Sequence, residues 1–66
     1  MQICVNGQKR DLPEGTSVAD LVGLLGLQPR RIAVERNGLL VPRASFGDTP
    51  LADQDVIEIV TLVGGG

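Results

Sequence analysis

Residues 16–27 read TSVADLVGLLGL, and this stretch predicts the helix around which the rest of the chain is arranged. Its apolar residues recur at i, i+3, i+4 and i+7, which places them on one face of a helix. Ser17 is the expected N-cap, with Thr16 as the alternative, because a side-chain hydroxyl there can accept a hydrogen bond from a free helix amide. Gly26 suits the position after the helix, where a positive φ is common. The apolar face consists of Val18, Leu21, Val22 and Leu25.

An Asn-Gly pair lies on each side of this helix, at residues 6–7 and 37–38. A type I′ turn needs positive φ at both central positions, and Asn-Gly is the strongest short signal for it. Each pair therefore predicts a β-hairpin, one before the helix and one after it. The expected strands are residues 1–5, 8–12, 32–34 and 39–41.

Val56–Val63 is the longest predicted strand, and residues 43–46 before it predict one short helical turn. The strand combines a continuous apolar run with alternation, which is typical of a central strand covered by a helix on one face. The helix can serve as the crossover that makes the first and last strands parallel neighbours. We therefore expect an α+β fold with a mixed sheet of about four to five strands and one main helix packed on one face. The domain spans residues 1–63, and residues 64–66 form a flexible tail.

The composition of the 66 residues limits the possible partners and locations. The net charge is −2 and no basic run exceeds two residues, which argues against nucleic-acid binding. No apolar stretch approaches the roughly 18 residues of a membrane span. The sequence enters a strand at its first residues, which leaves no room for a signal peptide. A single cysteine, Cys4, fits a reducing compartment, so we expect a cytoplasmic protein.

Several residue types that catalysis commonly uses are missing from the sequence. It has no histidine and only one cysteine, so it offers no imidazole base, no Ser-His-Asp triad and no thiolate zinc site. It also lacks the glycine-rich motifs that bind nucleotides. We predict that the protein is not an enzyme and binds no cofactor or metal of its own.

The sequence ends in Gly64-Gly65-Gly66, and this ending has two interpretations. Glycine adds no packing and loses much backbone entropy on ordering, so the tail is either a frayed end or a mobile arm. In the second interpretation, the terminal carboxylate is the reactive group of the molecule.

Taken together, these segments resemble the small sulfur carrier proteins of the ubiquitin-like β-grasp fold, and above all the ThiS family of thiamin biosynthesis. The resemblance covers nearly the whole chain. The quoted segments are NG at 6–7, GTSVADLVGLLGL at 15–27, RNGLLVPR at 36–43, TPLADQDVIEIVTLV at 49–63, and the final Gly65-Gly66.

One position departs from the family pattern. Members of the family often have Asp-Gly-Asp before the last strand, where this chain has Asp53-Gln54-Asp55. A glycine would suit a turn residue with positive φ, so Gln54 in the same geometry would be mildly strained. The departure concerns the turn and leaves the tail chemistry untouched.

The resemblance implies a specific chemistry for the tail. A ubiquitin-activating-type adenylyltransferase would use ATP to adenylate the carboxylate of Gly66, and a sulfur donor, a desulfurase or a persulfide, would convert it to a thiocarboxylate. Gly64 and Gly65 would thread into the partner, and thiazole synthase would receive the sulfur. The alternatives are a sulfur carrier for another pathway (molybdopterin, tRNA thiolation or cysteine) and a ubiquitin-like binding or modifier module.

The partner surface is expected where the sheet is left uncovered by the single helix, because outward apolar residues there form a patch. The candidates are Phe46, Leu62 and Val63, and Phe46 has the alternative role of a plug under its loop. Pairing along a sheet edge is a second possible docking mode.

Three kinds of polar or reactive residue have structural interpretations beside functional ones. Cys4 is expected to be a structural thiol on one face of the sheet rather than a sulfur acceptor. Arg36 and Arg43 are expected to be solvated charges, with pairing to a partner as the alternative. Asp53 and Asp55 are expected to bond to backbone amides within a turn.

Overall fold

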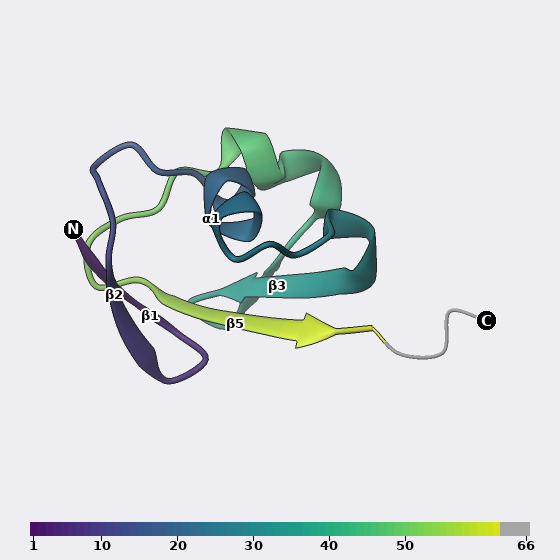
Figure 1. The fold of residues 1–66 in the computed structure, drawn as a ribbon, viewed down its shortest axis with the longest axis horizontal. Helices are drawn as coiled ribbons and strands as arrows, with labels where there is room; N and C mark the ends of the chain where they lie inside the picture. The colour runs from purple at the N-terminus through teal and green to yellow at the C-terminus, as the bar shows by residue number, and fades with distance from the viewer. Residues whose placement is uncertain (63–66) are drawn as a thin grey trace.

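The computed structural model describes residues 1–62, and its last strand lies at the centre of the sheet (Figure 1). Residues 63–66, which include the predicted tail and the end of the predicted last strand, lie outside the described residues. The elements are β1 (Gln2–Val5), β2 (Gln8–Asp11), α1 (Val18–Leu24), the 3₁₀ helix η1 (Pro29–Arg31), β3 (Ile32–Arg36), β4 (Leu39–Val41), the 3₁₀ helix η2 (Arg43–Asp48) and β5 (Val56–Thr61).

The sheet has five strands in the order β2-β1-β5-β3-β4. β1 and β5 run parallel, with Cys4 opposite Val56, and every other neighbouring pair is antiparallel. The structure thus confirms the mixed sheet and the parallel pairing of the first and last strands. α1 and η2 lie on the same side of the sheet (Figure 1).

Both ends of α1 follow from local sequence. Ser17 is the N-cap, and it forms a capping box with Asp20: the Asp20 amide donates to Ser17 Oγ at 3.1 Å, and the Ser17 amide donates to Asp20 Oδ2 at 3.0 Å. At the other end Gly26 has φ +71°, and the amides of Gly26 and Leu27 donate to the carbonyls of Gly23 and Val22. This is the Schellman ending that the Gly26 position predicts.

The core is aliphatic and lies between the sheet and the two helices on its covered face. Phe46, the one aromatic residue, is only 4% exposed and belongs to this core. It is therefore the plug beneath its loop, and its assignment to the partner surface is corrected. The buried residues are Ile3, Val5, Leu12, Val18, Leu21, Val22, Ile32, Val34, Val41, Phe46, Leu51, Ile57 and Ile59. None of the helices in residues 1–62 has the length and apolar character needed to cross a membrane.

Positive φ angles occur where the sequence predicts turns. Asn6 and Asn37 have φ of 50° and 52°, and the glycine after each is also positive, as type I′ turns require. Gln54 has φ +71°, so the residue that replaces the family's glycine does adopt the strained geometry.

Replacing Gln54 with glycine should raise the free energy of unfolding by about 0.5–1 kcal/mol. The left-handed conformation costs a residue with a side chain about 1–2 kcal/mol, and glycine avoids this cost. Glycine also makes the unfolded chain more flexible, which lowers the stability of the variant by about 0.4–1 kcal/mol and offsets part of the increase. Urea denaturation monitored by circular dichroism would measure the change. Ala52→Gly, two residues away at negative φ, should instead destabilise the fold, and equal effects of the two substitutions would contradict the strain argument.

Candidate functional site

The site that the sequence predicts is the tail, and β5 is the strand that leads to it. Asn6, the first residue of the first turn, holds this strand by its side chain. Its Nδ2 donates to the Ile59 carbonyl at 3.0 Å, and its Oδ1 accepts from the Ile59 amide at 2.8 Å. The Asn6 amide also donates to the Ile57 carbonyl at 2.9 Å. Asn6 therefore extends the ladder between β1 and β5 beyond the end of β1, using its side-chain amide in place of a backbone peptide.

Asn37, in the second turn, holds the opposite edge of β5. Its amide donates to the Val56 carbonyl at 2.8 Å, and its Oδ1 accepts from the Val56 amide at 2.9 Å. Its Nδ2 donates to Asp55 Oδ1 at 3.0 Å. Asn6 and Asn37 therefore each form hydrogen bonds to one edge of β5, the strand that leads to the tail. The Asn-Gly pattern predicts the turns but gives no sign of these contacts, because the partner strand lies far away in sequence.

Asp55 is buried, at 5% exposure, and three donors surround its carboxylate. Arg36 Nε donates to Oδ2 at 2.7 Å, the Ala52 amide donates to Oδ2 at 2.8 Å, and Asn37 donates to Oδ1. Burial acts to raise the pKa of Asp55, but the hydrogen bonds from Arg36, Ala52 and Asn37 outweigh it and hold the pKa below its usual value. Arg36 is therefore an internal partner of Asp55, not the solvated charge that the sequence favoured.

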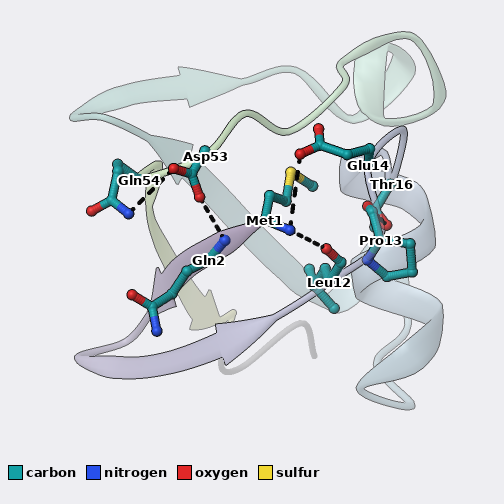
Figure 2. A network of polar contacts seen from close by, with 8 residues as sticks. All are labelled: Met1, Gln2, Leu12, Pro13, Glu14, Thr16, Asp53 and Gln54. Atoms are coloured by element: carbon teal, nitrogen blue, oxygen red, sulfur yellow. Dashed lines mark hydrogen bonds and ion pairs between the residues drawn. The ribbon is translucent and has the colours of Figure 1, made fainter.

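Asp53 ties the same turn to the beginning of the chain (Figure 2). The Gln2 amide donates to its Oδ1 at 2.7 Å, and Gln54 Nε2 lies 3.4 Å from its Oδ2. The hydrogen bond from Gln2, followed by that from Gln54, lowers the pKa of Asp53. The Met1 amine donates to the Leu12 carbonyl at 2.7 Å and lies 4.0 Å from the Glu14 carboxylate. Both carboxylates accept from backbone amides as predicted, but only Asp55 does so within its own turn, because the amide that bonds to Asp53 is that of Gln2 in β1.

Leu62 is the last described residue before the tail, and η1 holds its backbone. The Leu62 amide donates to the Arg31 carbonyl at 2.7 Å, while its side chain is half exposed. Arg43 in turn supports η1: its Nε donates to the Pro29 carbonyl at 3.0 Å and its Nη2 to the Arg30 carbonyl at 3.5 Å. Arg43 therefore has a structural role in fixing the place where the chain leaves the sheet. Val63, the third partner candidate, lies outside the described residues.

The face of the sheet opposite α1, which we call the open face, has no element of residues 1–62 packed over it (Figure 1). Cys4 lies on this side, half buried, between Lys9 of β2 and Val56 of β5 in the strand register. Residues 1–62 contain no group of three or more acidic or cysteine side chains placed to hold a metal ion. Besides Cys4 and Lys9, the open face carries Ala33, Glu35, Leu40, Val56, Glu58 and Val60.

Comparison with known proteins identifies the family. The ThiS family matches residues 3–66, which is almost the whole chain. The chain belongs to the ThiS family. Its β-grasp fold agrees: a ThiS crystal structure from Geobacter metallireducens superposes with a TM-score of 0.86 at 32% identity, covering all of both chains.

Curated relatives of this ThiS-family chain fall into two groups by length. The sulfur carrier protein ThiS of Thermus thermophilus is 36% identical over 69 residues, covering 97% of this chain and 98% of the relative. The thiazole synthase of Paramagnetospirillum magneticum is 39% identical over 66 residues, but this chain spans only 20% of its length. The same share applies to the thiazole synthase of Magnetococcus marinus.

Replacing Asp55 with asparagine should lower the free energy of unfolding by about 1.5–3 kcal/mol at pH 7, because the donors around it lose a charged acceptor. The pKa of Asp55 is depressed in the folded state, so the stability it contributes is present at neutral pH and is lost as the pH falls below about 4. The difference in free energy of unfolding between the wild type and the variant should therefore be smaller at pH 3 than at pH 7. Denaturant titrations at both pH values would measure it.

Asp48→Asn is the control for Asp55→Asn, because Asp48 is exposed and outside this network. A variant at Asp55 that loses no more stability than Asp48→Asn would show that the Arg36 contact contributes nothing.

Replacing Asn6 with glycine should keep the turn but remove both side-chain hydrogen bonds to Ile59. We expect a loss of about 1–2 kcal/mol and a 5- to 30-fold faster exchange of the Ile59 amide proton, measured by NMR. Asn6→Asp, which keeps only the acceptor, should lie between the glycine variant and the wild type. If the exchange of β3 amide protons becomes faster by the same factor as that of Ile59, the substitution destabilises the whole domain. The local role of the Asn6 side chain in holding β5 is then refuted.

Proposed function

We propose that this chain is a sulfur carrier that holds sulfur as a thiocarboxylate on Gly66 and donates it to the thiazole moiety of thiamin. The observation that carries the proposal is the family match over residues 3–66, which includes the three glycines. In this role the protein is a cosubstrate of other enzymes and not a catalyst. It acts in the cytoplasm and needs no cofactor of its own.

The chemistry explains why the acyl group sits on a glycine. A carboxylate is a poor electrophile, so a ubiquitin-activating-type adenylyltransferase first joins it to the α-phosphate of ATP and releases pyrophosphate. The terminal sulfur of a persulfide on the donor, such as a desulfurase, then attacks the carbonyl carbon and AMP leaves, which gives an acyl disulfide. A further thiol attacks the donor's sulfur, forms a disulfide with it and releases the thiocarboxylate on Gly66. Glycine has no Cβ, so it offers the attacking atoms the least steric hindrance.

The described residues support tail delivery in two ways. β5 is central in the sheet and is held on both edges, so the origin of the tail at Leu62 is fixed in position. Four residues follow Leu62, and an extended stretch of that length spans roughly 13 Å. Gly64 and Gly65 would then pass through a channel too narrow for larger side chains. Ordering them costs about 1–2 kcal/mol per residue, so the folded body must supply compensating contacts.

We assign those contacts to the end of β5, with Leu62 and Val63 as the first candidates. Leu62 is half exposed and borders a shallow hollow of about 170 Å³ that Ala33, Leu40 and Pro42 also line. Thiazole synthase is the proposed acceptor of the sulfur. Supporting this choice, two relatives that carry a segment like this chain within a longer protein are thiazole synthases.

Intact-mass measurement of the protein from its own cells tests the proposal. A fraction should be heavier by one sulfur-for-oxygen exchange located on Gly66, and it should be absent when Gly66 is deleted. Incubation of the purified chain with the adenylyltransferase and sulfur donor should produce the same species only when ATP is present.

The alternative functions of the chain predict different results in the mass measurement. A carrier for molybdopterin, tRNA thiolation or cysteine would bear the same mass change, but thiamin starvation would not increase it. A modifier would appear as conjugates of higher mass, and a plain binding module would keep its affinity without Gly66. An unmodified Gly66 in the presence of ATP, donor and adenylyltransferase would refute sulfur carriage.

A further inference from the structure

Two glutamates face each other at the centre of the open face. Glu35 of β3 and Glu58 of β5 are direct cross-strand partners in the antiparallel register. Side chains in such a pair leave the same face of the sheet, with Cβ atoms roughly 4.5–5.5 Å apart. Like charges placed directly opposite destabilise a sheet. Both residues are exposed, and no described residue forms an ion pair with either carboxylate.

Apolar side chains surround this carboxylate pair. Val56 and Val60 lie two residues to either side of Glu58 on the same strand, and they are 47% and 56% exposed. Leu40 lies beside Glu35 on β4 and is 66% exposed. Around β5 the open face is therefore an apolar surface with two carboxylates at its centre. The repulsion between these carboxylates does not stabilise the isolated protein.

We infer that the open face docks the adenylyltransferase through a basic side chain that inserts between Glu35 and Glu58. An arginine fits this position best, because its fork of N–H groups can bond two carboxylates and its aliphatic stem can lie against Val56, Val60 or Leu40. This inference rests on the proposed function and specifies the chemistry of the partner surface. It adds Glu35 and Glu58 as specificity-determining residues to the apolar contact at Leu62.

Charge complementarity argues against the other possible occupants of this face. A second copy of the chain would bring four carboxylates together across the interface, and Lys9, which lies on this face, is separated from Glu58 by β1 in the strand order. Nucleic acids and anionic membranes would meet the same repulsion. A protein with a basic side chain inside an apolar patch removes the repulsion and covers the exposed valines and leucine in one contact.

The position of the pair also fits a partner that receives the tail. Glu58 lies on β5, four residues before Leu62, so only a short stretch of sequence separates the docking contact from the start of the tail. A partner that binds at Glu58 and Val60 meets Leu62 next and then the residues that lead to Gly66.

The test uses Glu35→Gln, Glu58→Gln and the double variant in a pyrophosphate-exchange assay with the adenylyltransferase from the same cells. The double variant should raise the KM for the carrier at least roughly tenfold, with kcat nearly unchanged, because only binding is lost. Its melting temperature should rise, because the like-charge repulsion is gone. The wild-type KM should also increase more steeply with salt than the variant KM.

The control is the double variant Glu14→Gln with Asp48→Asn, which changes the net charge equally at two exposed sites outside the open face. The inference would be overturned if the KM of the Glu35→Gln, Glu58→Gln double variant equalled that of the wild type, or if the KM of the control rose by the same factor. Either result would leave sulfur carriage intact. Absence of any exchange with the wild-type chain would refute the proposed function itself. Self-association of the wild type through this face would also overturn the inference.

Discussion

The parallel pairing of β1 with β5 is the constraint on which the rest of the structure depends. It places the first and last strands side by side in the same direction, which forces the chain between them to cross over the sheet, and α1 makes this crossing. It also places β5 in the middle of the sheet, where both of its edges are bonded. The registered part of this pairing is short, only Cys4 with Val56 and Val5 with Ile57. The side chain of Asn6 lengthens it, and for that reason a turn residue matters to the central strand.

A small domain can spare little stability, so its buried polar contacts need complete partners. The Asp55 carboxylate meets this condition, because its donors come from three separate places: β3, the second turn and the loop before β5. No buried side-chain nitrogen or oxygen atom in residues 1–62 lacks a hydrogen-bond partner. The start of β5 is consequently fixed by a polar network, its middle by apolar packing of Ile57 and Ile59, and its end by the Leu62 bond to η1.

Sequence reasoning succeeded where the determining interactions are local. The helix ends at Ser17 and Gly26, the two Asn-Gly turns and the strained Gln54 were all predictable, because each depends on a few neighbouring residues. The roles of Asn6, Arg36 and Arg43 were missed, because their partners lie 13 to 53 residues away. Phe46 was ambiguous for a similar reason: a large apolar residue in a loop fits a plug or a surface contact equally well until the fold is known. The opposed glutamates became visible only with the strand register, since nothing in sequence links residue 35 to residue 58.

The division of the sheet into a covered face and an open face connects fold to function. The covered face holds the core, so substitutions there act mainly on stability. The open face carries the exposed side chains of Val56, Val60 and Leu40, which contribute little to the core, together with a like-charge pair that opposes folding. A local arrangement that works against folding is expected at functional sites, and this one supports the proposal that the open face docks a partner. β5 supplies residues to both faces in alternation and precedes the tail in sequence, so one strand links the stability of the domain to the proposed docking surface.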